Sequence, residues 1–170
     1  MRMPSNRRND GRAFETQVEA ILRVYESKGL MSVRKVDPPT KVIGGRVIFQ
    51  ANPFPDFIGA WTERGGRMIA FEAKSTLDAR LEANGNRGIT ITQMRSLREW
   101  RNANAATFVL WEHRGVVKMV PDFRLRTLHE AHSKSIGWDD LEAFVVPAGT
   151  GYVTADFRSL MLKVWRDPVR

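Results

Sequence analysis

The sequence predicts an α/β fold, a mixed β-sheet flanked by helices, and three observations support this class. Segments with apolar residues at helical spacing are followed along the chain by the short apolar or alternating runs typical of strands. Their order, one helix, several strands, a second helix and more strands, is that of a layered α/β domain. The length of 170 residues, 42% of them hydrophobic, suits one domain with an ordinary core.

The helices are predicted from apolar stripes and from the residues that end them. The first spans residues 11–28, where a stripe of apolar side chains precedes Gly29: Phe14, Val18, Ile21, Leu22 and Tyr25. We expect a second helix at 90–104, a last amphipathic helix at 155–166, and shorter helices near 122–132 and 138–143. Residues 1–10 lack such a stripe and are expected to form a flexible basic arm, which leaves 11–170 as a single domain.

Strand patterns occupy residues 31–37, 56–61, 67–73, 106–112 and 116–120.

A further pair of short strands surrounds Gly44-Gly45, a dipeptide that suits a two-residue turn because glycine readily adopts positive φ. Since Pro39 and Pro53 bracket this hairpin, we expect it to protrude as a stalk over residues 38–54. Lys41 and Arg46 on its arms are compatible with an ordinary exposed loop or with a probe for nucleic acid.

The composition narrows the possible functions. Lys and Arg total 27 against 19 Asp and Glu, and the net charge of +8 favours a polyanionic partner such as nucleic acid. The absence of Cys excludes a disulfide scaffold, a zinc ribbon and a thiol nucleophile. No apolar run is long enough to span a membrane, and the basic N-terminus lacks the apolar stretch of a signal peptide, so we expect a cytoplasmic protein with no membrane partner.

The predicted strands on either side of Arg64 bring charged residues together. If Gly65 takes the left-handed position of the turn, the register is symmetric about Arg64 and Asp56 lies opposite Glu72. Directly opposed residues have Cβ atoms about 4.5–5.5 Å apart. The side-chain period of two places Lys74 on the same face as Glu72, so the three residues are predicted to form one cluster.

Two opposed carboxylates between apolar flanks need compensation, because like charges repel and burial removes their hydration. A Mg²⁺ ion would supply it, since Mg²⁺ prefers carboxylate oxygens and keeps positions for water and phosphate. The backbone carbonyl of Ala73 could add a ligand, and Lys74 would then lie beside the phosphate. The alternative is that Lys74 bridges Asp56 and Glu72 as a salt-bridge cluster. The register, the apolar flanks and the basic charge of the chain favour the metal site.

Gln93 has two interpretations of similar weight. Thr90-x-x-Gln93 is a capping box for the second helix, and the same glutamine could position a catalytic water. The three histidines, His113, His129 and His132, lack an acidic ligand at convincing spacing and are expected at the surface.

The cluster resembles the PD-(D/E)xK nuclease superfamily, with Pro55-Asp56 and Glu72-Ala73-Lys74 as the motif. The wider pattern is similar to that of RecU-type Holliday junction resolvases and extends over most of the chain. The further matching pieces are Gly11-Arg12-Ala-Phe-Glu15, Arg34-Lys35, Pro38-Pro39-Thr40, Asp56-Phe-Ile-Gly59, the run from Met68 to Thr76, Gln93 and Phe108-Val-Leu110. Nearer the C-terminus they are Lys134-Ser135-Ile136, Asp140-Leu-Glu142, Gly151 and Asp156-Phe157.

The resemblance implies a restriction-endonuclease-like core with a stalk, and a homodimer that cuts four-way DNA junctions symmetrically with Mg²⁺ or Mn²⁺ and no small-molecule cofactor. It would act in the cytoplasm of a bacterium or of a phage-infected host. The implied catalytic residues are Glu15, Asp56, Glu72, Lys74 and Gln93, with Asp56, Glu72, Ala73 and Glu15 as direct or outer metal ligands. The basic residues expected to contact DNA are Arg7, Arg8, Arg12, Lys35, Lys41, Arg46 and Arg87. The alternatives are another PD-(D/E)xK nuclease, of restriction or branch-trimming type, and a non-catalytic junction-binding protein.

Overall fold

A five-stranded mixed sheet forms the centre of the fold in the computed structural model, which describes residues 7–49, 54–82, 88–130, 135–149 and 154–165. The strand order is β1-β4-β5-β7-β8. Of the neighbouring pairs, β5 and β7 are parallel and the others are antiparallel. The strands are β1 (Ser32–Lys35), β4 (Phe57–Trp61), β5 (Arg67–Ser75), β7 (Ala106–His113) and β8 (Val116–Pro121). The predicted mixed α/β architecture is therefore confirmed.

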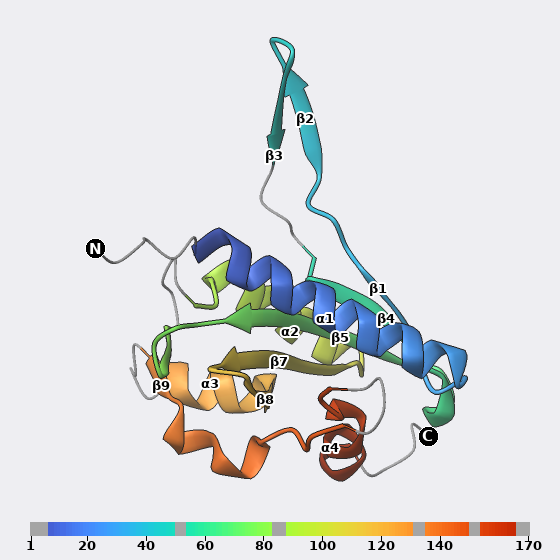
Figure 1. Cartoon of the computed structure of the whole chain (residues 1–170). Helices are drawn as coiled ribbons and strands as arrows, with labels where there is room; N and C mark the ends of the chain where they lie inside the picture. Colours follow the sequence, from blue (N-terminus) through green and yellow to red (C-terminus); the bar gives the residue numbers. More distant parts are fainter. Residues whose placement is uncertain (1–6, 50–53, 83–87, 131–134, 150–153, 166–170) are drawn as a thin grey trace.

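Helices cover both faces of the sheet (Figure 1). One face packs against α1 (Arg7–Ser27) and α4 (Phe157–Val164), and the other against α2 (Ile91–Asn102) and α3 (Asp122–Glu130). Each face has its own hydrophobic cluster, and the apolar stripe predicted for α1 is buried in the first of them. No helix in the described parts of the chain combines the length and the apolar character needed to cross a membrane.

An aromatic stack aligns the three central strands. Phe57, Phe71 and Phe108 are paired directly across β4, β5 and β7, and neighbouring rings are stacked with centroids 4.8 and 4.7 Å apart. Adjacent residues of a strand face opposite sides of a sheet. Because the stack lies on the α1 side, Glu72, the residue that follows Phe71, is directed to the α2 side, where Gln93 contacts it. Asp56 directly precedes Phe57 and lies near the same Lys74 ammonium group as Glu72.

Helix α4 closes the α1 side over this stack. The ring of Phe157 lies 6.0 Å from that of Phe71 and 6.3 Å from that of Phe108, measured between centroids. The neighbouring Arg158 donates from Nε and Nη2 to the two carboxylate oxygens of Glu63, each at 2.6 Å. A bidentate ion pair therefore fastens α4 to the turn between β4 and β5.

The predicted hairpin is present and projects away from the sheet (Figure 1). Its strands are β2 (Thr40–Ile43) and β3 (Arg46–Phe49), joined by Gly44 and Gly45 with φ of 56° and 75°. These positive values are what the two-residue turn requires. The opposed Val42 and Val47 are 67% and 60% exposed, so this valine pair is open to solvent.

Several element boundaries differ from the predictions. Helix α1 begins at Arg7, so residues 7–10 are helical and do not belong to a flexible arm, whereas residues 1–6 lie outside the described residues. The segment expected as a helix near 138–143 is a 3₁₀ helix, η2 (Asp139–Phe144). A short strand β6 (Arg80–Glu82) pairs with β9 (Ser135–Gly137), which local patterns do not predict because the two segments are far apart in sequence.

The prediction that His113 lies at the surface is wrong. His113 is 6% exposed, and its Nδ1 lies 3.0 Å from the carbonyl oxygen of Thr76. The centroid of its ring is 5.3 Å from that of Trp138. Strand β7 continues to His113, and Trp138 covers this end of it. The side chains of His129 and His132 lie outside the described ones.

Candidate active site

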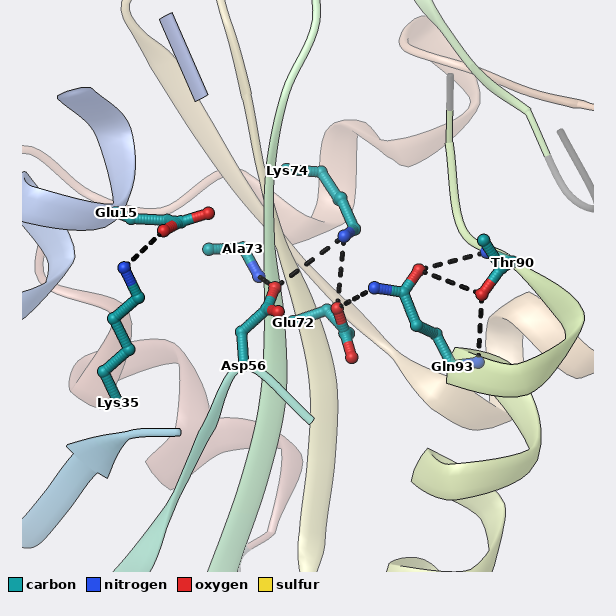
Figure 2. Close-up of polar contacts among 8 residues, drawn as sticks. All are labelled: Glu15, Lys35, Asp56, Glu72, Ala73, Lys74, Thr90 and Gln93. Atoms are coloured by element: carbon teal, nitrogen blue, oxygen red, sulfur yellow. Dashed lines mark hydrogen bonds and ion pairs between the residues drawn. The ribbon is translucent and has the colours of Figure 1, made fainter. Parts of the chain in front are cut away.

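Asp56, Glu72 and Lys74 lie together where β4 begins and β5 approaches its end (Figure 2). The observed register pairs Phe57 with Phe71, which continues to Asp56 opposite Glu72 as the symmetry about Arg64 requires. Lys74 Nζ lies 3.2 Å from Glu72 Oε2 and 3.7 Å from Asp56 Oδ2. The structure thus brings together the three side chains that a single hairpin register predicts.

Glu72 is the most deeply placed member of the cluster, with 0% of the residue exposed. Its Oε2 accepts a hydrogen bond from Gln93 and contacts Lys74. Its Oε1 is buried and has no hydrogen-bond partner within the described residues. Burial is the largest influence on the pKa of Glu72, which rises to about 8; Lys74 opposes this rise and Asp56 adds to it. A buried carboxylate oxygen without a partner is unfavourable, and a cation beside it would remove that penalty.

Lys74 and Asp56 form the solvent-facing side of the cluster, with side chains 21% and 24% exposed. Burial alone would lower the pKa of Lys74, but Glu72, Asp56 and Glu15 raise it, and the net shift is upward. The lysine is therefore a stable ammonium at neutral pH. Asp56 Oδ2 also accepts the backbone N–H of Ala73 at 3.1 Å, which fixes this carboxylate against β5.

Gln93 is the helix cap that the sequence offered as one interpretation, and the same side chain also binds Glu72. It closes the capping box of α2, because its backbone N–H donates to Thr90 Oγ1 at 3.2 Å and its Oε1 accepts the backbone N–H of Thr90 at 3.1 Å. The other end of the same amide, Nε2, donates to Glu72 Oε2 (Figure 2). The helix cap and the carboxylate cluster are thus connected through one side chain.

Glu15 lies on α1 apart from the two opposed carboxylates and faces Lys35 of β1 (Figure 2). Lys35 Nζ is 2.7 Å from Glu15 Oε2 and 3.9 Å from Glu19 Oε1. No group of three Asp, Glu, His or Cys side chains close enough to hold a metal occurs in the ranges that the structure describes, so Glu15 does not complete such a group. Sequence reasoning missed this ion pair, because α1 and β1 become neighbours only through the tertiary fold.

Four of the basic residues predicted to contact DNA have side chains that the structure describes. Lys41 and Arg46 are exposed on the hairpin, and Arg12 is exposed near the start of α1. Lys35 is 28% exposed and is engaged by acidic side chains, whose hydrogen bond and charge raise its pKa. The remaining side chains of this set lie outside the described ones: Arg7, Arg8 and Arg87.

Two carboxylates and a lysine lie together where β4 begins and near the end of β5, in a mixed sheet between helical layers. This arrangement agrees with the PD-(D/E)xK nuclease motif that the sequence resembles. The particular family follows from the sequence: the family described as Recombination protein U, RecU, matches residues 9–146. The chain belongs to this family. The resemblance that the motifs indicated is thereby confirmed.

One solved structure similar to this chain is Hjc, a Holliday junction resolvase from the archaeal hyperthermophile Archaeoglobus fulgidus. The two chains are 17% identical, and the match covers 66% of this chain and 73% of that one with a TM-score of 0.44. No curated protein matches the chain.

Proposed function

We propose that this chain resolves four-way DNA junctions as a homodimer, by metal-dependent hydrolysis of one phosphodiester bond in each of two strands. The observation that carries the proposal is Glu72 Oε1, a fully buried carboxylate oxygen without a hydrogen-bond partner in the described part of the chain, next to the second carboxylate of Asp56. A salt-bridge cluster alone leaves this oxygen unsatisfied, because Lys74 contacts the other one.

The donor set fits a divalent cation with a preference for oxygen, and Mg²⁺, with Mn²⁺ as a substitute, is the one we propose. Asp56 and Glu72 would hold it, with the Ala73 carbonyl as a third donor. Glu15 would act as an outer ligand through water, since Lys35 already holds its carboxylate. When bound, the cation supplies Lewis-acid neutralisation of the charge that develops on the scissile phosphate.

The side chains of this protein contribute binding and orientation. Lys74 is protonated and partly exposed, so its ammonium group can donate hydrogen bonds to a phosphate oxygen and stabilise the negative charge that builds up there. Gln93 keeps Glu72 in place from the opposite side. Water attacks phosphorus in line, and the 3′ oxygen of the cut strand leaves.

Binding of branched DNA is proposed to use the exposed cations of the hairpin and of α1, Lys41, Arg46 and Arg12. We also propose Arg7, Arg8 and Arg87 as DNA contacts. Lys35 is left out of this set because its ammonium group pairs with Glu15. The net charge of +8 supports such a role, and the affinity should fall steeply with salt because counterions are released from DNA on binding. Residues 7–170 would act as one nuclease domain, since α1 begins at Arg7, with the stalk at 38–54, in the cytoplasm of a bacterium or of a phage-infected host.

The test is a cleavage assay on an immobile four-way junction with and without Mg²⁺ or Mn²⁺. We expect paired nicks at symmetric positions in two strands, and no cutting in EDTA. A preference for plain duplex would instead indicate another nuclease of the same fold. Binding of the junction without any product in either metal would identify a non-catalytic junction-binding protein.

A further inference from the structure

Thr90 makes three contacts with Gln93 at the start of α2, and two of them involve the oxygen of the Gln93 side-chain amide. Gln93 Oε1 accepts the backbone N–H of Thr90 at 3.1 Å and the Thr90 hydroxyl at 3.3 Å. The third contact runs from the Gln93 backbone N–H to Thr90 Oγ1. Because both donors act on the oxygen end, the nitrogen end of the amide is turned away from Thr90 and toward Glu72 (Figure 2).

The orientation of this amide matters because its two ends have opposite hydrogen-bonding character. Nε2 donates to Glu72 Oε2, the oxygen that Lys74 also contacts. A reversed amide would place an oxygen against a carboxylate oxygen, and two acceptors repel each other. With the amide held as observed, Glu72 Oε2 is occupied by two donors and Oε1 is the carboxylate oxygen without a hydrogen-bond partner in the described ranges.

A capping box needs only contacts between the cap residue and the third helical residue. The bond from Gln93 to Glu72 joins residues that are 21 positions apart and lies outside that motif. It ties the first turn of α2 to the most buried carboxylate of β5, so the same three contacts that begin the helix also set the geometry of the cluster.

We infer that Thr90 is a positioning residue of the active site, which acts through Gln93 to hold Glu72 with its Oε1 directed to the cation. This inference rests on the proposed function, because it assigns Glu72 as a metal ligand. Thr90 itself is exposed, and its hydroxyl bonds to Gln93, so it supports the site without taking part in the reaction.

Two substitutions separate this role from helix capping. Thr90→Ser keeps the hydroxyl and should retain full cleavage. Thr90→Gly removes the hydroxyl but leaves a residue that is tolerated at the N-cap, so the protein should fold. For Thr90→Gly we expect kcat on the immobile junction to fall about tenfold with little change in KM, because one hydrogen bond that orients a charged group is lost.

A second readout does not depend on cleavage. Mn²⁺ alone is titrated into the DNA-free protein in a calorimeter, and Thr90→Gly should bind it about five- to tenfold more weakly, whereas Thr90→Ser should match wild type. Equal Mn²⁺ affinity in all three proteins would overturn the inference.

A double-mutant cycle with Gln93→Met supplies the decisive comparison, with thermal unfolding recorded for every variant. If Thr90 acts through Gln93, Thr90→Gly has no further effect on kcat once the amide is absent. If Thr90→Gly lowers kcat equally with and without the Gln93 amide, Thr90 supports only the helix and the inference is wrong. The same conclusion follows if the loss of kcat parallels a fall in melting temperature and Thr90→Ser does not restore kcat. A wild-type protein that cuts no junction would contradict the proposed function instead, and the Mn²⁺ titration would still decide the role of Thr90.

Discussion

At the scale of single residues, Glu72 is a buried carboxyl group whose pKa is raised mainly by burial. Burial raises its pKa from 4.5 to about 8 in the folded protein, whereas the unfolded chain keeps the ordinary value. Between these two pH values the unfolded chain releases a proton that the folded protein retains. The stability that Glu72 contributes is therefore fully present below its unfolded pKa and is lost as the pH rises through its folded pKa.

Glu72→Gln removes this titration while nearly preserving the shape of the side chain. In metal-free buffer, the free energy of unfolding of wild type relative to the variant should fall as the pH rises from about 5 to about 9, by up to about 1.4 kcal/mol for each unit of pKa shift. Urea denaturation across this range is the measurement. A constant difference would show that the carboxylate is already ionised in the fold, and Mn²⁺ should stabilise wild type but not Glu72→Gln.

Lys74→Met separates catalysis from structural pairing. It removes the ammonium group but keeps an unbranched side chain, so cleavage should fall by about 10²–10³-fold while junction binding, measured by mobility shift in Ca²⁺, stays near wild type. Lys28→Met, on an exposed lysine at the end of α1, is the matched control and should cut normally. A joint loss of binding, folding and cleavage would favour the salt-bridge cluster.

The sequence predicted those contacts that depend on one local register. Asp56 and Glu72 face each other because a single hairpin pairs them, and alternation along β5 adds Lys74. The contact of Glu15 with Lys35 could not be predicted from the sequence, since it requires α1 to lie over the sheet beside β1. The capping box of Gln93 was predictable from Thr90-x-x-Gln93, whereas its hydrogen bond to Glu72 was not, because that contact depends on how α2 packs on β5.

At the scale of elements, the hairpin β2–β3 exposes the apolar side chains of Val42, Ile43 and Val47. A two-stranded hairpin is only marginally stable in water, and here its apolar side chains are exposed on both strands. Its position was predictable from two prolines and a Gly-Gly turn, which act locally. The pairing of β6 with β9 was not predictable, because both strands are short and their register is set by long-range packing.

The double variant Lys41→Gln/Arg46→Gln tests the hairpin as a DNA contact. If both side chains bind phosphates, the slope of log Kd against log salt concentration should decrease by about two, and the affinity should fall at low salt. Junction affinity is measured over a salt series by fluorescence anisotropy. The control is Arg23→Gln/Arg34→Gln, which removes the same charge from arginines that already pair with Glu19 and Glu26. Equal slopes in both variants would contradict the assignment.

At the scale of the whole molecule, the order of segments was sufficient to predict a mixed sheet between helices, since alternating helices and strands have few ways to bury their apolar faces. The arrangement of two copies on DNA is a separate matter, and we propose a two-fold dimer because symmetric incisions need two equivalent sites.

Mixed dimers of wild type and Asp56→Asn test this arrangement. A dimer with one working site should nick a supercoiled cruciform plasmid to an open circle, whereas the wild-type dimer should convert it directly to linear DNA. Differently tagged chains, purified in tandem, supply the mixed species, and gel analysis separates the products. Linear DNA produced by the purified mixed dimer at the wild-type rate would show that one site makes both cuts.

The position of α4 has a consequence for how the protein folds during its synthesis. Asp56, Glu72 and Lys74 are all synthesised well before Phe157, yet it is Phe157 that shields the stacked rings of Phe71 and Phe108. A growing polypeptide that already contains the whole carboxylate cluster thus still exposes the aromatic underside of the strands that carry it. The strands that carry the cluster should therefore reach their final packing only after α4 has left the ribosome and docked beside α1.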